Sequence, residues 1–141
     1  MEKALRVDFK LCSGCRICEL HCSLKHYGLI NSRKSRIRVH RDHHSLVNTP
    51  QVCLQCSGRF CIDACPPKIR ALSIDGRTSA VIVDVEKCIG CGKCVKACPY
   101  EGIELLSGEK TVIVCDLCGG DPECVKHCPE GVLSYTARGK E

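Results

Sequence analysis

At 141 residues the chain is long enough for one compact unit, but its 44% hydrophobic content includes sixteen cysteines. With no tryptophan and only five phenylalanines and tyrosines, packing of side chains is not enough, and metal or disulfide bonds must stabilise the fold. The net charge of +5 is modest. By itself this charge excludes neither an acidic nor a neutral binding partner.

Short apolar segments rich in β-branched residues recur along the chain, and each predicts a strand. Those segments are residues 4–9, 36–40, 69–74, 80–85, 102–105, 110–114 and 131–135. Asp75-Gly76 lies between the third and the fourth and predicts a hairpin turn. The first and last segments flank the chain, and we expect them to pair with each other. Loops and single helical turns are expected elsewhere.

The segment at residues 36–40 alternates apolar and basic side chains. In a strand, Ile37 and Val39 lie on one face and Arg36 and Arg38 on the other. We interpret the segment as a solvated strand. The two arginines are expected to face solvent, with docking against a larger subunit as the alternative.

The N-terminal sequence MEKALR contains neither the apolar core of a signal peptide nor a cleavage site of small residues. A reducing cytoplasm is therefore the expected location. No apolar run approaches the roughly 18 residues that a transmembrane helix needs, the longest comparable stretch being residues 80–85. No membrane span is expected.

The cysteines form four quartets, each of which opens with C-x-x-C and closes with C-x-x-x-C. The quartets are Cys12, Cys15, Cys18, Cys22; Cys53, Cys56, Cys61, Cys65; Cys88, Cys91, Cys94, Cys98; and Cys115, Cys118, Cys124, Cys128. Only the middle gap varies, at two, four, two and five residues. Proline follows the last cysteine of three quartets, whereas Ser23 follows Cys22. The pattern is an internal repeat.

This spacing suits a 4Fe-4S cubane, which needs four thiolates at tetrahedral corners. One tight loop can carry the first three cysteines, and glycines at positions 14, 90, 92, 119 and 120 let the backbone approach the cluster closely. The fourth cysteine lies past a helical turn and serves a second cluster in two-cluster proteins. With four such clusters, each about −2 with its thiolates, the net charge falls to about −3, which removes a general case for nucleic-acid binding.

The sequence DVEKCIGCGKCVKACP at residues 84–99 resembles the motif of bacterial two-cluster ferredoxins. Further segments carry a wider resemblance: CSGCRICELHCS at residues 12–23, SRIRV at 35–39 and CDLC at 115–118. With them, nearly the whole chain is similar to the four-cluster iron-sulfur subunits of molybdenum- and tungsten-pterin oxidoreductases. These include subunits of the aldehyde oxidoreductase, formate dehydrogenase and DMSO reductase type.

The resemblance implies an α+β fold of two nested ferredoxin modules, with residues 51–106 as the inner module and residues 1–50 plus 107–141 as the outer one. It also implies four 4Fe-4S clusters with crossed ligands. The implied sets are Cys53, Cys56, Cys61 with Cys98; Cys88, Cys91, Cys94 with Cys65; Cys12, Cys15, Cys18 with Cys128; and Cys115, Cys118, Cys124 with Cys22.

Zinc and disulfides are the rival interpretations of the cysteines. A zinc site of two C-x-x-C pairs leaves the third cysteine of each quartet and the three Cys-Pro closures unexplained, and a disulfide framework does not fit a cytoplasmic chain. Sixteen cysteines already complete four clusters, so the histidines are expected at the surface or behind the ligands. They are His21, His26, His40, His43, His44 and His127.

The sequence contains no Ser-His-Asp set, carboxylate pair, Walker loop or dinucleotide motif, so no catalytic residue is predicted. A cluster with four cysteine ligands transfers one electron and has no open iron position for substrate. We therefore expect an electron-transfer subunit that links a larger tungsten or molybdenum enzyme to a second redox partner, such as a ferredoxin or a flavin or NAD subunit. A free-standing polyferredoxin shuttle is the alternative, and a cluster-based sensor is a third possibility.

Overall fold

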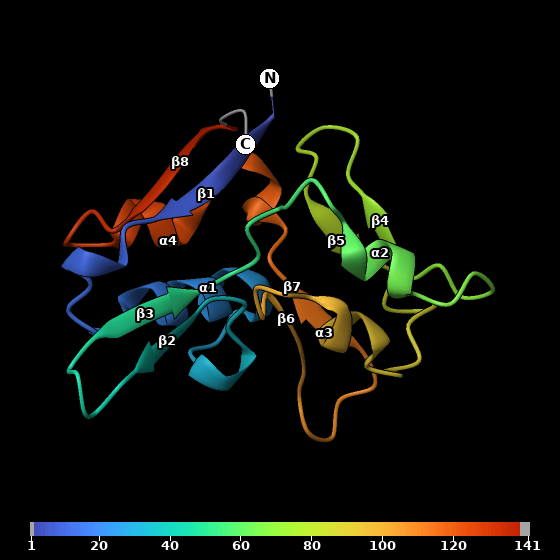
Figure 1. The fold of residues 1–141 in the computed structure, drawn as a ribbon, viewed down its shortest axis with the longest axis horizontal. Coiled ribbons are helices and arrows are strands. Elements are labelled where there is room, and N and C mark those ends of the chain that lie inside the picture. Colours follow the sequence, from blue (N-terminus) through green and yellow to red (C-terminus); the bar gives the residue numbers. More distant parts are fainter. Residues whose placement is uncertain (1, 139–141) are drawn as a thin grey trace.

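A computed structural model describes residues 2–138 of the chain (Figure 1). In this part, eight short strands form four antiparallel pairs. β1 (Lys3–Val7) pairs with β8 (Leu133–Ala137), β2 (Arg38–Arg41) with β3 (Asn48–Gln51), β4 (Leu72–Ile74) with β5 (Val81–Val83), and β6 (Ile103–Leu105) with β7 (Val112–Val114). Four α-helices and three short 3₁₀ helices complete an α+β fold, as the sequence predicted.

The pairing of β1 with β8 brings the two ends of the chain together, with Leu5 opposite Tyr135. This pairing was expected from the apolar segments that flank the chain. In Figure 1 the elements α1, β1, β2, β3, α4 and β8 share one side of the molecule, whereas α2, α3, β4 and β5 occupy the other. The middle of the chain is therefore inserted between two ends that fold together.

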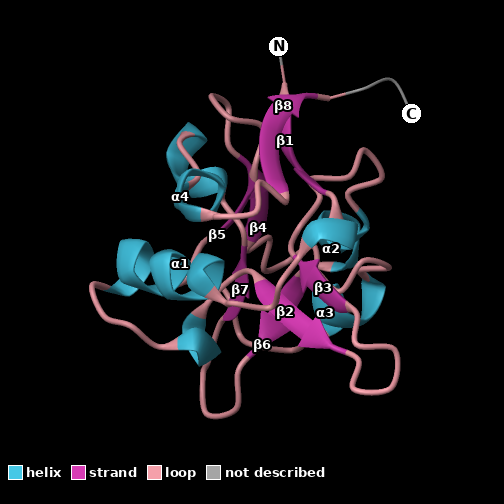
Figure 2. Ribbon diagram, turned by 90° about the vertical axis from the view of Figure 1, so that its left-hand side faces the viewer, coloured by secondary structure: helices cyan, strands magenta, loops and turns pink. Residues whose placement is uncertain are grey.

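The helices are α1 (Ile17–Tyr27), α2 (Phe60–Ala64), α3 (Lys93–Ala97) and α4 (Glu123–His127). Each carries the third cysteine of its quartet as its second residue. Helix α1 packs against α4, and α2 packs against α3. Figure 2 shows the two helix pairs on opposite sides of the strands.

Proline decides where three of these helices end. α2, α3 and α4 stop directly before Cys65, Cys98 and Cys128, since the proline that follows each cysteine disfavours a helical conformation of that cysteine. Ser23 imposes no such limit after Cys22, and α1 continues to Tyr27, where Gly28 caps it at φ 70°. The expectation of single helical turns was therefore wrong for α1.

One strand was missed by the sequence analysis. β3 has the sequence NTPQ, which has little β-branched character and contains Pro50. It pairs with β2 through the register Val39 opposite Pro50. The other predicted strands are present, with their ends shifted by one to three residues, and Asp75-Gly76 lies in the turn between β4 and β5.

The core is built from small apolar side chains and buried cysteines, with Leu5, Ile37, Val81 and Leu117 each at most 2% exposed. Ile37 and Val39, which the alternation placed on one face, are buried. The opposite face differs from the expectation. Arg36 pairs with Asp116 and Arg38 pairs with Glu104, so both arginines are engaged within the chain and are not free docking groups.

Among residues 2–138, the longest helix has 11 residues, and none combines the length and the apolar character that crossing a membrane requires.

Replacing Ile37 by alanine is expected to lower the free energy of unfolding by about 2–5 kcal/mol, because a side chain only 1% exposed leaves a cavity in a small core. Urea denaturation under anaerobic conditions would measure the change. Ile30, which is 65% exposed, supplies the matched control, and Ile30→Ala should change stability by no more than about 0.5 kcal/mol. Equal effects of the two substitutions would contradict this assignment of the core.

Candidate metal centres

Three cavities are each lined by four cysteines from two quartets. One cavity is lined by Cys53, Cys56, Cys61 and Cys98, another by Cys12, Cys15, Cys18 and Cys128, and the third by Cys88, Cys91, Cys94 and Cys65. Their volumes are similar, at about 340, 330 and 310 Å³, as expected of a repeated unit. In each cavity three cysteines come from one loop and the fourth follows the helix of the packed partner quartet.

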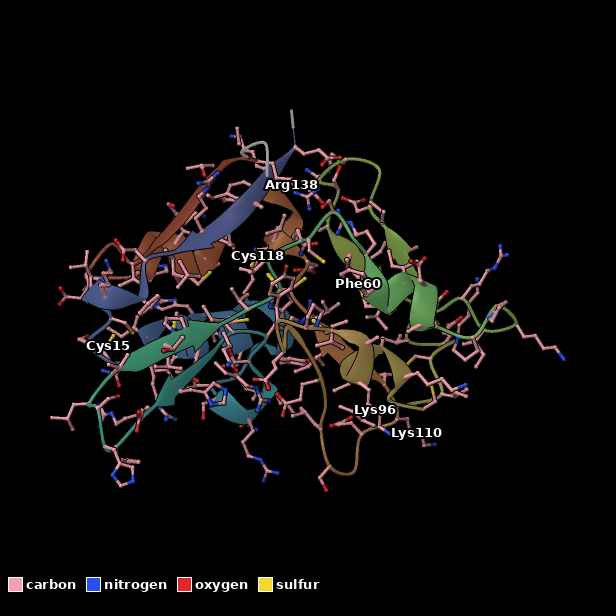
Figure 3. The ribbon with its side chains drawn as sticks, in the orientation of Figure 1. Cys15, Phe60, Lys96, Lys110, Cys118 and Arg138 are labelled. Atoms are coloured by element: carbon pink, nitrogen blue, oxygen red, sulfur yellow. The ribbon has the colours of Figure 1, made fainter. Side chains whose placement is uncertain are left out.

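The remaining four cysteines also approach one another. Cys22 is close enough to Cys115, Cys118 and Cys124 for its thiolate charge to raise their pKa. Cys124 is in turn a neighbour of Cys18. This set lies near the middle of the molecule, where Figure 3 shows Cys118, whereas Cys15 lies toward one end.

The fourth set borders two of the cavities. Its Cys124 is a neighbour of Cys18 in the cavity of the first quartet, and its Cys115 is a neighbour of Cys53 in the cavity of the second quartet. The sixteen sulfurs thus occupy four adjacent groups. Whether each group ligates a single cluster stays a prediction.

None of the sixteen cysteines forms a disulfide. Burial raises the pKa of Cys18 and Cys124 to about 12 and that of Cys53 and Cys94 to about 11. Burial also raises the pKa of Cys115 well above its usual value. Without a cation these thiols stay protonated at neutral pH. The donor set therefore fits a positively charged iron centre, whose binding displaces the protons.

Backbone N–H groups donate to the sulfur of the fourth cysteine in three quartets. The Arg36 amide lies 3.3 Å from Cys22 Sγ, the Ala71 amide 3.3 Å from Cys65 Sγ, and the Gly102 amide 3.4 Å from Cys98 Sγ. Such donors stabilise negative charge on sulfur and tune the potential of an iron-sulfur cluster. They are a second sign that the cavities fit thiolate-bound clusters.

Gly102 shows how closely the backbone is packed here. A β-carbon at this position would lie 2.7 Å from Cys53 Cα, a distance that packed atoms do not tolerate. Glycine is therefore required where the strand after Cys98 passes the first cysteine of the second quartet.

A polar network surrounds Cys22. His26 Nδ1 lies 3.8 Å from Cys22 Sγ, and its Nε2 lies 2.9 Å from Asp116 Oδ1. Asp116 Oδ2 pairs with Arg36 Nη1 at 3.1 Å. Burial opposes ionisation of Cys22, but hydrogen bonds from His26, Arg36 and Ser35 outweigh it and lower the pKa of this thiol. The surroundings of Cys22 thus favour its thiolate form.

The sequence analysis placed His26 behind the ligands only as one of six histidines and did not single out Asp116. His26 lies four residues after Cys22, one helical turn away, so the missing proline after Cys22 was the available signal. The remaining partner, Asp116, is 90 residues distant in sequence and could not be found by spacing.

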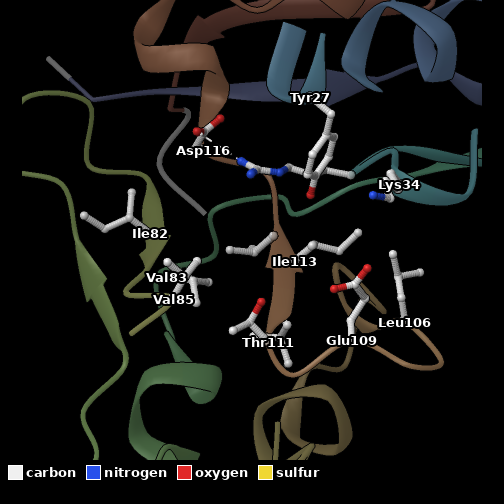
Figure 4. A pocket seen from close by; sticks show the side chains of 13 residues that line it. Tyr27, Lys34, Ile82, Val83, Val85, Leu106, Glu109, Thr111, Ile113 and Asp116 are labelled. Atoms are coloured by element: carbon white, nitrogen blue, oxygen red, sulfur yellow. Dashed lines mark ion pairs between the residues drawn. The ribbon is translucent and has the colours of Figure 1, made fainter. Parts of the chain in front are cut away.

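A further hollow, wider than the three cavities, has no cysteine in its lining. It is an open groove between α1 and the strands β5 and β7, lined by Tyr27, Lys34, Ile82, Ile113 and Asp116 among others (Figure 4). Its floor contains the ion pair of Asp116 with Arg36. Its lining mixes apolar and paired charged groups, and it supplies no nucleophile paired with a base.

Comparison with known proteins gives concordant results. Residues 44–138 match the 4Fe-4S dicluster domain family. The polyferredoxin-like subunit of an aliphatic sulfonate oxidoreductase from Pyrococcus furiosus is 50% identical over 84% of this chain and 67% of its own length. Electron transport protein HydN of Escherichia coli K12 is 29% identical over 99% of the chain and 91% of its own length.

A solved structure extends the similarity to the fold. A chain of the active site complex BamBC of benzoyl coenzyme A reductase, with 1,5-dienoyl-CoA, superposes with a TM-score of 0.57 at 28% identity. The alignment covers 99% of this chain and 78% of the other. The short helices and strand pairs around the cysteines are therefore shared with this chain of the complex.

Crossed ligation predicts which cysteine variants share a spectrum. Cys98→Ala should disturb the same cluster as Cys56→Ala, because Cys98 and Cys56 line one cavity. Cys65→Ala should match Cys91→Ala for the same reason. EPR of the reduced protein, with one variant at a time, would show which signals change together. A Cys98→Ala spectrum that matches Cys91→Ala would mean that each quartet holds its own cluster.

Gly102→Ala is expected to remove the cluster beside Cys53, since the added methyl group displaces the Cys53 backbone. Iron analysis should fall from about sixteen to about twelve atoms per chain. Gly76 has no neighbour within 4 Å of a built β-carbon, so Gly76→Ala should keep the full iron content. Full iron content in Gly102→Ala would show that the contact is easily relieved.

Proposed function

Because the chain belongs to the 4Fe-4S dicluster domain family, we propose that it transfers electrons through four 4Fe-4S clusters as a subunit of a larger oxidoreductase. Bound clusters supply reversible one-electron oxidation and reduction. The chain supplies the thiolates, the amide donors and the burial that hold them.

We assign the ligands by the groups in which the sulfurs lie. The first group is Cys12, Cys15, Cys18 and Cys128, and the second is Cys115, Cys118, Cys124 and Cys22. The third is Cys53, Cys56, Cys61 and Cys98, and the fourth is Cys88, Cys91, Cys94 and Cys65. The cavities support three of these sets, and the mutual proximity of the cysteines supports the remaining one.

The order of the four cysteine groups in space supports the proposal that the clusters form a path for electrons. Neighbouring sulfurs put the groups in a line: Cys18 is near Cys124, and Cys115 is near Cys53. The packing of α2 on α3 joins the third group to the fourth. The only two exposed cysteines, Cys15 and Cys91, belong to the first and last groups. Electrons can therefore enter at one end and leave at the other.

The two ends of this line fall in different parts of the chain. We propose that residues 51–106 form an inner two-cluster module and residues 1–50 plus 107–141 an outer one. The pairing of β1 with β8 and the packing of α1 on α4 support the outer module. Packing of α2 on α3 supports the inner one.

A complete cysteine shell around each cluster leaves no iron position for substrate, so the subunit is non-catalytic and its substrate belongs to a partner. The Pyrococcus furiosus relative is a subunit of an aliphatic sulfonate oxidoreductase, and the similar solved chain belongs to a benzoyl coenzyme A reductase complex. We propose a tungsten- or molybdenum-pterin enzyme as the large partner and a ferredoxin or a flavin or NAD subunit as the second.

Native purification from the host organism tests this assignment. We expect the chain to elute in gel filtration together with a larger subunit, and metal analysis of that complex to find tungsten or molybdenum beside iron. Elution as a free single chain would favour the alternative, a diffusing polyferredoxin. A complex without either metal would keep electron transfer but reject the pterin partner.

A further inference from the structure

The residue before the fourth cysteine divides the quartets into two pairs. It is alanine in the second and third quartets, at Ala64 and Ala97, and histidine in the first and fourth, at His21 and His127. These positions are equivalent in the repeat, and in each pair they lie on helices that pack together. The helix pair α1 and α4 therefore carries two imidazoles where α2 and α3 carry two methyl groups.

The two histidine rings meet where α1 and α4 pack. Their centroids are 3.6 Å apart and their planes differ by only 5°. The next residue in each chain segment is a cysteine of the predicted cluster sets, Cys22 or Cys128. Each histidine is therefore next in sequence to a cysteine of these sulfur groups, and the groups that organise the fold also hold the backbone of both histidines in place.

Glu123, at the start of α4, completes a group of three. Its Oε2 lies 3.3 Å from His127 Nε2, and one ligand atom from each of His21, Glu123 and His127 lies within 4.8 Å of the others. Tetrahedral bonds of about 2.0–2.1 Å place neighbouring ligand atoms roughly 3.3 Å apart. The carboxylate and the imidazole thus already have the separation of two ligands of one ion. Because the two rings are stacked in nearly parallel planes, the His21 ring must rotate out of the stack to direct a nitrogen at the same ion.

The surroundings leave room for an ion. Lys126 Nζ pairs with the other carboxylate oxygen, Oε1, at 3.2 Å and also contacts Asp121. Oε2 faces His127 instead. The side chain of His127 is 42% exposed and that of Glu123 is 22% exposed, so an ion can reach the group from solvent and keep water as a further ligand.

We propose that His21, Glu123 and His127 bind one divalent transition-metal ion of the Zn²⁺ type between α1 and α4. Two imidazoles and one carboxylate are a ligand set that zinc accepts with an open fourth position, and imidazole suits the first-row divalent metals in general. The ion joins the two helices of the outer module and has no counterpart between α2 and α3. This site goes beyond the electron-transfer proposal and does not depend on it.

Calorimetric titration of the cluster-loaded protein with Zn²⁺ under anaerobic conditions tests the site. We expect about one ion per chain, with the visible absorption of the clusters unchanged. His21→Ala, His127→Ala and Glu123→Gln should each weaken binding at least about tenfold, since even outer-shell partners of metal ligands contribute about 10–100-fold. The alanine variants recreate the residues that α2 and α3 already carry, so they are expected to fold and to keep their iron.

His43 provides the control, because it lies in the exposed turn between β2 and β3. His43→Ala should bind Zn²⁺ as tightly as the parent chain. Parent binding no tighter than that of the His21→Ala/His127→Ala double variant would overturn the proposal, as would a loss in His43→Ala equal to that in His127→Ala. Unchanged iron content in the double variant keeps a negative result separate from any failure of the electron-transfer assignment.

Discussion

Burial of cysteine sulfur around shared cavities is the interaction on which the structure depends. The apolar side chains are few and small, and seven of the buried core residues are themselves cysteines, namely Cys18, Cys22, Cys53, Cys61, Cys94, Cys115 and Cys124. Burial raises the pKa of most of these thiols, so they become thiolates only when a cation replaces the proton. Folding and cluster binding are therefore coupled, as expected of a small domain that lacks a large core.

The residue directly after the fourth cysteine of each quartet determines which groups lie near the sulfurs. Proline after Cys65, Cys98 and Cys128 limits three helices to one short stretch each, and a turn then leads to the next strand. Ser23 lets α1 run on past Cys22. The extra turn places His26 against Cys22 and Asp116, which gives this sulfur a polar environment that the others do not share.

The repeat is therefore not uniform. The outer helix pair meets through the stacked rings of His21 and His127, whereas the inner helices carry Ala64 and Ala97 at the equivalent positions. The arginines of β2 add a further link, because Arg38 reaches Glu104 on β6 and Arg36 reaches Asp116. The pair of Arg38 with Glu104 joins the two proposed modules, and the pair of Arg36 with Asp116 joins the two segments of the outer one. Such links suit a chain whose cysteine groups must stay in fixed mutual positions for electron transfer.

The sequence alone determined the chemistry, because C-x-x-C spacing is local: a loop of a few residues either wraps three sulfurs or does not. It also predicted the α+β class, the flanking strands that pair and the shared face of Ile37 and Val39. Tertiary structure alone decided the contacts between distant segments, such as His26 with Asp116, Arg38 with Glu104, and the meeting of His21 with His127. Each of these joins residues that are 66 to 106 positions apart, where no local spacing constrains the approach and only the packing of helices and strands sets the distance.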